Sequence, residues 1–177
     1  MEGTCSFKFN NTMYILGGPP NAMASTQMLV LNQCILQRVG TLNYPMNGCL
    51  GAVYFVETKG PFDQTIITET PIVCASAEDP KGCYGFDPLD KKEKWLDKNA
   101  FPNDFQESHY GGAMTIYKGT PFVVGGRKTL IAEHMIYFIN GTNAWSPTLP
   151  MPGVEKRAFL SAVSFDNKVT IEFTSTL

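Results

Sequence analysis

The 177-residue sequence has no apolar run close to the roughly 18 residues that a membrane-spanning helix needs. Its first ten residues include Glu2 and lack the hydrophobic segment of a signal peptide. Charged residues are also scarce, at 17%, and the net charge is −2, so there is no basic surface of the kind that binds nucleic acid or an anionic membrane. We therefore expect neither membrane insertion nor a nucleic-acid partner.

The motifs of common enzymes are absent as well. The sequence has no G-x-S-x-G, H-E-x-x-H or Walker A motif and no G-x-G-x-x-G between a strand and a helix. It has two histidines, His109 and His134, and none of its five cysteines forms a C-x-x-C pair. This composition predicts a non-enzymatic protein with no metal site and no cofactor.

The residues that are present favour β-strands. Short runs rich in Val, Ile, Tyr, Phe and Thr are bounded by Gly, Pro, Asn and Asp, and no window keeps a 3.6-residue apolar period over helix length. Asn140-Gly141 is the strongest two-residue hairpin signal, because both positions tolerate positive φ. We expect an all-β chain with strands near residues 5–9, 12–17, 28–32, 34–39, 49–56, 67–75, 82–87, 94–97, 112–117, 121–125, 134–139, 143–148, 160–165 and 168–173.

Three marks recur along the chain at intervals of about 50 to 60 residues, a spacing typical of repeated four-stranded units. The first is a small pair that ends an apolar strand, as in Gly17-Gly18, Ala75-Ser76 and Gly125-Gly126. The second is a small pair that opens the following strand, as in Gly51-Ala52, Gly112-Ala113 and Ser161-Ala162. The third is an aromatic residue followed by a tryptophan, as in Tyr84 with Trp95 and Tyr137 with Trp145.

With these marks the chain resembles the kelch-repeat family over essentially its whole length. The resemblance is best in the third unit, which contains Gly125-Gly126, Tyr137, Trp145, the LPMP stretch and Arg157. It implies a kelch-type β-propeller of four-stranded antiparallel blades, in which the glycine pairs let the backbone approach the Tyr and Trp side chains of neighbouring strands. The pattern is degenerate in places: Ala75-Ser76 replaces one glycine pair, no Trp lies near Val39, and Glu172-Phe173 stand where a fourth pair is expected.

Fourteen expected strands at four per blade correspond to about three and a half blades. We treat residues 1–177 as one incomplete propeller domain with units near 1–47, 48–108, 109–157 and a partial 158–177. Propellers have roughly four to eight blades, so three and a half kelch blades cannot close a ring. The remaining blades are expected to lie outside this chain; the alternative is a ring assembled from two such arcs.

The resemblance implies a protein-interaction scaffold that binds another protein through the loops joining one blade to the next. The matching positions are Arg157, Lys156, Asn47, His109 and Tyr110. The structural alternative for Arg157 is an ion pair with a neighbouring blade. The charged stretches at 78–82 and 87–94 are interpreted as solvated hairpin tips.

Cysteines and sequons bear on the compartment. Cys74 ends one expected strand and Cys83 opens the next, so the two can form a disulfide across the pair; buried free thiols are the alternative. Sequons at Asn10 and Asn140 fall on expected hairpin tips, where a glycan can be accommodated. The stretch from Cys34 to Leu42 also resembles extracellular, cysteine-bearing kelch-like proteins. These features favour a secreted glycoprotein.

Two other functions remain open. One is a cytoplasmic substrate-recognition propeller like those fused to BTB domains in ubiquitin-ligase adaptors. The other is part of a copper oxidase of the galactose-oxidase type, whose metal needs two tyrosines, two histidines and a cysteine. His109 and His134 occupy different positions within their repeat, which argues against convergence on one metal.

Overall fold

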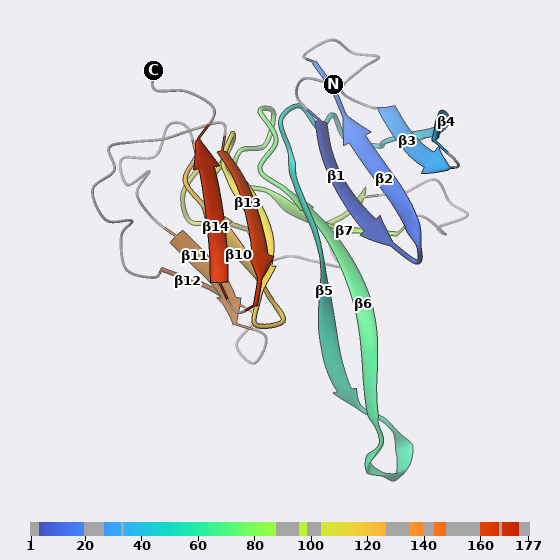
Figure 1. Cartoon of the computed structure of the whole chain (residues 1–177), viewed down its shortest axis with the longest axis vertical. Coiled ribbons are helices and arrows are strands. Elements are labelled where there is room, and N and C mark those ends of the chain that lie inside the picture. Colours follow the sequence, from blue (N-terminus) through green and yellow to red (C-terminus); the bar gives the residue numbers. More distant parts are fainter. Residues whose placement is uncertain are drawn as a thin grey trace.

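The computed structural model describes residues 4–19, 27–32, 34–87, 96–98, 104–126, 135–139, 144–147, 160–166 and 168–173. Within these ranges the chain forms fourteen strands and one short 3-10 turn, η1 (Pro61–Asp63), so the fold is all-β (Figure 1). Each expected strand is present, and most strand ends agree to within one or two residues. None of the described segments forms a helix long and apolar enough to cross a bilayer.

The strands form three four-stranded sheets and one two-stranded sheet, each antiparallel and each in simple chain order. The first sheet contains β1 (Thr4–Phe9), β2 (Thr12–Gly17), β3 (Gln27–Asn32) and β4 (Ile35–Thr41). The second contains β5 (Leu50–Lys59), β6 (Thr65–Cys74), β7 (Cys83–Phe86) and β8 (Leu96–Asp97). The third contains β9 (Ala113–Tyr117), β10 (Thr120–Val124), β11 (Met135–Ile139) and β12 (Ala144–Pro147), and the fourth contains β13 (Leu160–Phe165) and β14 (Lys168–Phe173).

Successive sheets pack against one another, with a separate hydrophobic core for each pair. Side chains alternate between the two faces of a strand. Val73 therefore packs toward the first sheet, whereas its neighbours Ile72 and Cys74 pack toward the third. In β10, Val123 packs toward the second sheet, and Phe122 and Val124 pack toward β14. Burial on both faces explains why residues 71–74 of β6 and 121–124 of β10 are continuous apolar runs rather than alternating ones.

The first strands of the four sheets also lie next to one another. β1 contacts β5, β5 contacts β9, and β9 contacts β13, although none of these pairs shares a sheet. The small opening pairs make this approach possible. A side chain at Gly51, for example, would place its Cβ 2.7 Å from the ring of Phe7 in β1.

The small pairs that end β2, β6 and β10 share an unusual backbone. Gly17, Ala75 and Gly125 all have positive φ, at 76°, 54° and 65°. Ala75 thus keeps the glycine-like conformation at a cost of about 1–2 kcal/mol. The expected reason for the glycine pairs needs correction. A Cβ at Gly17 would overlap the carbonyl oxygen of Met46, and one at Gly126 would lie 2.7 Å from the Cα of His109, so the glycines admit loop backbone rather than aromatic rings.

Candidate functional site

Three loops gather at the end of the sheets where β6 and β10 finish. Residues 42–49 lead into β5, residues 75–82 join β6 to β7, and residues 104–112 lead into β9. Backbone hydrogen bonds connect them. The amide of Ala77 donates to the carbonyl of Asn47 (2.8 Å), that of Phe105 to Lys81 (2.8 Å), and that of His109 to Pro80 (3.0 Å). We call this continuous surface, formed by 42–49, 75–82 and 104–112, the loop face.

His109 is expected to contact a partner, but it is only 2% exposed. Its Nδ1 lies 2.7 Å from the carbonyl oxygen of Gly125, and its ring packs edge-on against Phe105 at 4.9 Å between centroids. Its own carbonyl accepts a hydrogen bond from Gly112. The imidazole therefore ties the loop before β9 to the glycine pair of the third sheet, and little of its surface is left for a partner.

Asn47 is buried too. Its amide donates to Oε2 of Glu78 (3.2 Å), and its carbonyl accepts from Ala77, which fixes the 42–49 loop to the 75–82 loop. Tyr110 is half-buried, and its ring covers Gly48, where a Cβ would overlap it. Of the three predicted contact residues in the described ranges, Tyr110 has the most side chain available; Lys156 and Arg157 lie outside those ranges.

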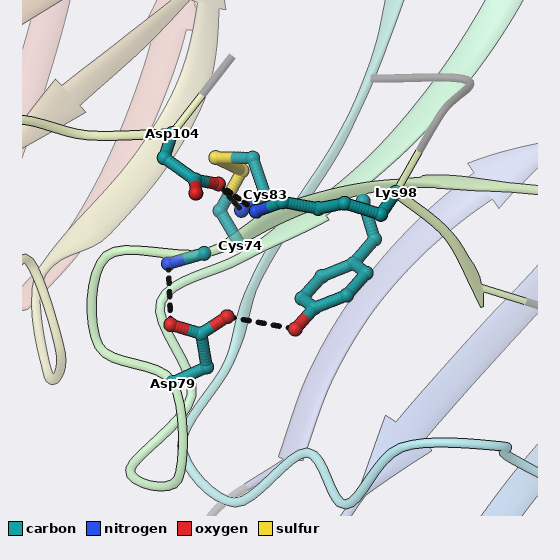
Figure 2. A network of polar contacts seen from close by, with 7 residues as sticks. Cys74, Asp79, Cys83, Lys98 and Asp104 are labelled. Atoms are coloured by element: carbon teal, nitrogen blue, oxygen red, sulfur yellow. Dashed lines mark hydrogen bonds and ion pairs between the residues drawn. A yellow bond between two sulfur atoms is a disulfide. The ribbon is translucent and has the colours of Figure 1, made fainter. Parts of the chain in front are cut away.

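A polar network supports the middle of the loop face (Figure 2). Asp79 accepts hydrogen bonds from the Gly82 amide at Oδ1 (3.0 Å) and from the Tyr84 hydroxyl at Oδ2 (2.7 Å). Burial raises the pKa of Tyr84 above its usual range, and the hydrogen bond to Asp79 and that carboxylate's charge raise it further. Tyr84 is thus a neutral hydrogen-bond donor. Asp79 closes the 79–82 turn and is half-buried, whereas Glu78 and Lys81 in the same stretch are exposed, as expected for a solvated tip.

A second carboxylate completes the network. Asp104 accepts from the amide of Cys83 (3.0 Å) and forms an ion pair with Lys98, whose ammonium lies 5.0 Å from the centre of the Tyr84 ring. Tyr44 packs against the same ring at 5.0 Å and remains exposed. The exposed side chains of the loop face include Tyr44, Ala77, Glu78, Lys81, Asp104 and Gln106.

Of the other predicted motif residues, two lie in the hydrophobic cores and three lie wholly or partly outside the described residues. Tyr84 lies in the core between the first and second sheets, and Trp145 lies in the core between the second and third, 4.6 Å from Phe105. Trp95, Asn140 and the side chain of Tyr137 fall outside the described residues. In the part of the chain that the structure describes, no three His, Cys, Asp or Glu side chains are grouped as metal ligands.

Two disulfides are present. Cys74 and Cys83 lie directly opposite each other in β6 and β7 and are bonded, which was one of the two alternatives left open by the sequence. Cys5 is bonded to Cys49, 44 residues away, a pairing that the sequence did not predict. It joins β1 to the residue that precedes β5. Cys34 is free and exposed. Two disulfides indicate an oxidising, extracellular-type environment.

These observations define the chain as an all-β protein of consecutive, packed antiparallel sheets with a connected loop face. No protein-family model matches it, and no curated protein matches it. Its fold is similar to a solved structure titled "Structure of YjhT", with a TM-score of 0.59 and 14% sequence identity. The match covers 95% of this chain but 56% of the other, so this chain spans a little over half of that length. At this identity the similarity concerns the fold alone.

Proposed function

We propose that the chain is an arc of a kelch-type β-propeller and acts as a non-catalytic scaffold that binds another protein through the loop face. The observation that carries this proposal is the contact of successive first strands, β1 with β5, β5 with β9 and β9 with β13. In a propeller each sheet presents its innermost strand to a central channel, so such strands are neighbours without being hydrogen-bonded. The positive φ shared by Gly17, Ala75 and Gly125 supports a structural repeat.

Exposed apolar side chains on β13 support a further sheet packed against the last described one. Phe165 on β13 is 82% exposed, and Val163 on the same strand is also exposed. The corresponding first strands β5 and β9 are covered by the next sheet. Another sheet packed on β13 would cover these side chains in the same way and continue the ring.

The disulfides favour an extracellular propeller over the cytoplasmic BTB-type alternative. Cys5 and Cys49 are both buried, and their bond crosses between two sheets, so it forms part of the fold rather than a surface modification. The backbone hydrogen bonds that join the three loops support an ordered surface for a protein ligand, and an ordered surface loses little entropy on binding.

Replacing exposed Tyr44 and half-buried Tyr110 together by alanine is expected to weaken partner binding by about 10-fold or more, because tyrosines that combine fixed packing with accessible surface are frequent hot spots. A partner would be identified by crosslinking the chain to cell-surface proteins, and affinity would then be measured with the purified pair. Ile35→Ala, which removes an exposed apolar side chain on β4, is the matched control and should leave affinity unchanged. Equal loss in both variants, or none in the double variant, would exclude the loop face.

Secretion is expected to leave two disulfides and a glycan on the chain. After expression in a secreting eukaryotic cell, alkylation without reduction should modify Cys34 alone, because the other four cysteines are bonded. Asn10 is exposed in the β1–β2 turn, so glycosidase treatment should convert it to aspartate with a measurable loss of mass. Asn10→Gln is the control. Five reactive thiols and an unmodified Asn10 would contradict an extracellular protein.

A further inference from the structure

The β5–β6 hairpin is longer than its counterparts and projects beyond the sheets (Figure 1). β5 and β6 have 10 residues each, whereas β1, β2, β13 and β14 have 6 and β9 and β10 have 5. Only the half next to the loop face is buried in the cores. We call residues 55–70 the projecting hairpin. It points away from the loop face, because it lies at the opposite end of β6.

The projecting hairpin exposes apolar side chains that no core uses. Phe62 at its tip is 93% exposed and Ile67 is 61% exposed. The tip is nevertheless ordered by its own contacts: the amide of Gly60 donates to the carbonyl of Gln64 (2.8 Å), and Lys59 lies 3.7 Å from Asp63. Near its base, the amide of Asn10 donates to the carboxylate of Glu69 (3.5 Å). A preformed, apolar and exposed element of this kind is typical of a docking surface.

One edge of the projecting hairpin has no partner among the described strands. β7 pairs with β6 only from Ile72 to Cys74, and no described strand pairs with that edge of β6 from Thr65 to Thr70. Pro71, which has no amide hydrogen, separates this stretch from the β7 ladder. A strand added from Thr65 to Thr70 would pair with the β6 edge without moving any described element.

The outer edge strand of the first sheet is protected. β4, the edge of the first sheet, carries Arg38 and a register shift opposite Met28 and Leu29, and charges and bulges both discourage strand addition. On the other strand of the projecting hairpin, β5 carries Glu57 and Lys59. The β6 edge from Thr65 to Thr70 has a single charge, Glu69, and no proline.

The charge of the hairpin indicates the kind of strand that fits. Residues 55–70 hold three carboxylates, Glu57, Asp63 and Glu69, and one ammonium, Lys59, which is paired with Asp63. Glu57 lies opposite Ile67 and Phe55 opposite Glu69, so Glu57, Lys59 and Glu69 share a face with Ile67. A strand beside β6 would set its alternate side chains next to Glu69, the one charged side chain of β6 on this face, and the hairpin as a whole carries two more carboxylates than ammonium groups.

We propose that the β6 edge from Thr65 to Thr70 is a strand-addition site for an extended segment of another protein in which basic and apolar residues alternate. It is a second surface, separate from the loop face, and it does not depend on the partner proposed there.

The probe is a synthetic seven-residue peptide of alternating lysine and valine, added to the whole chain at low salt. Amide hydrogen exchange at Thr65, Ile67 and Glu69, whose amides face the free edge, should slow about 10-fold or more at saturation, and binding should weaken as salt rises. A peptide with glutamate in place of lysine should not bind. Exchange that slows at β4 instead, or nowhere, would overturn the proposal.

Ile67→Lys should reduce peptide affinity at least 10-fold, because it places a positive charge at the edge that repels the lysines of the peptide. Ile35→Lys makes the same change on β4 and is the matched control. Ile67→Pro removes an edge donor and should also abolish the protection, with folding checked by circular dichroism. The Tyr44 and Tyr110 double variant should bind the peptide normally, which separates this site from the loop face. If Ile35→Lys and Ile67→Lys reduce peptide affinity equally, the peptide does not bind at the β6 edge. If the unmodified chain self-associates and Ile67→Lys abolishes that association, the occupant is a second copy of this chain rather than a strand of another protein.

Discussion

Replacing Gly17 by alanine should lower the free energy of unfolding by about 3 kcal/mol or more. The left-handed backbone at φ 76° accounts for about 1–2 kcal/mol. The remainder follows from packing, because the new Cβ would overlap the carbonyl oxygen of Met46. The 42–49 loop would have to move, and it places Leu42 and Met46 in the core between the first and second sheets.

Gly119 provides a matched control for this substitution. Its φ of 79° is nearly the same, but an alanine Cβ there would meet no atom within 4 Å. Gly119→Ala should therefore cost about 1–2 kcal/mol, the backbone contribution alone. Urea unfolding of the two variants measures the difference. If both lose the same stability, close packing of the 42–49 loop against Gly17 is not what requires glycine.

Removing the Cys5–Cys49 disulfide is expected to cost about 4 kcal/mol, against about 3 kcal/mol for Cys74–Cys83. The difference arises because the first bond closes a sequence separation of 44 residues and the second a separation of 9, so the first removes more freedom from the unfolded chain. The first bond also joins two sheets, whereas the second joins neighbouring strands of one sheet.

Alanine at both Cys5 and Cys49 should thus lower the melting temperature more than alanine at both Cys74 and Cys83. Hydrogen exchange should become faster throughout β1 to β4 in the first variant, since the first sheet loses its covalent link to β5. Cys34→Ala is the control, because Cys34 is exposed and unbonded. A first variant no less stable than this control would show that the link between the sheets contributes nothing to the fold.

Local patterns predicted most of the strands. The apolar runs that end in Gly17, Cys74 and Val124 are short, rich in β-formers and followed by small residues, so their limits are encoded nearby. The Cys74–Cys83 pair is local as well, because the two residues flank a single turn. Cys74 and Cys83 lie opposite each other as soon as β6 and β7 are recognised as neighbouring antiparallel strands.

The features that the sequence did not predict depend on contacts between distant segments. Cys5 and Cys49 meet only because β1 and β5 lie side by side. His109 and Asn47 belong to connecting loops, which are usually solvated, yet both are buried because those loops bond to the 75–82 loop.

The length of the projecting hairpin was also underestimated. Gly60 and Pro61 are strong turn residues, and the charged and polar residues around them favour a broad loop. Instead, positive φ at Phe62 and Asp63 makes a compact tip, and both strands run up to it. A single sequence offers no sign that residues with side chains will adopt this conformation.

The loop face is joined mainly through main-chain atoms, as in the bonds from Ala77 to Asn47, from Phe105 to Lys81 and from His109 to Pro80. Side-chain identity at exposed positions such as Tyr44, Ala77 and Gln106 is therefore largely uncoupled from the geometry of the surface that displays them. Such a surface can diversify its specificity through point substitutions while the scaffold stays constant, as antibody frameworks do, and it offers a natural platform for engineered recognition libraries.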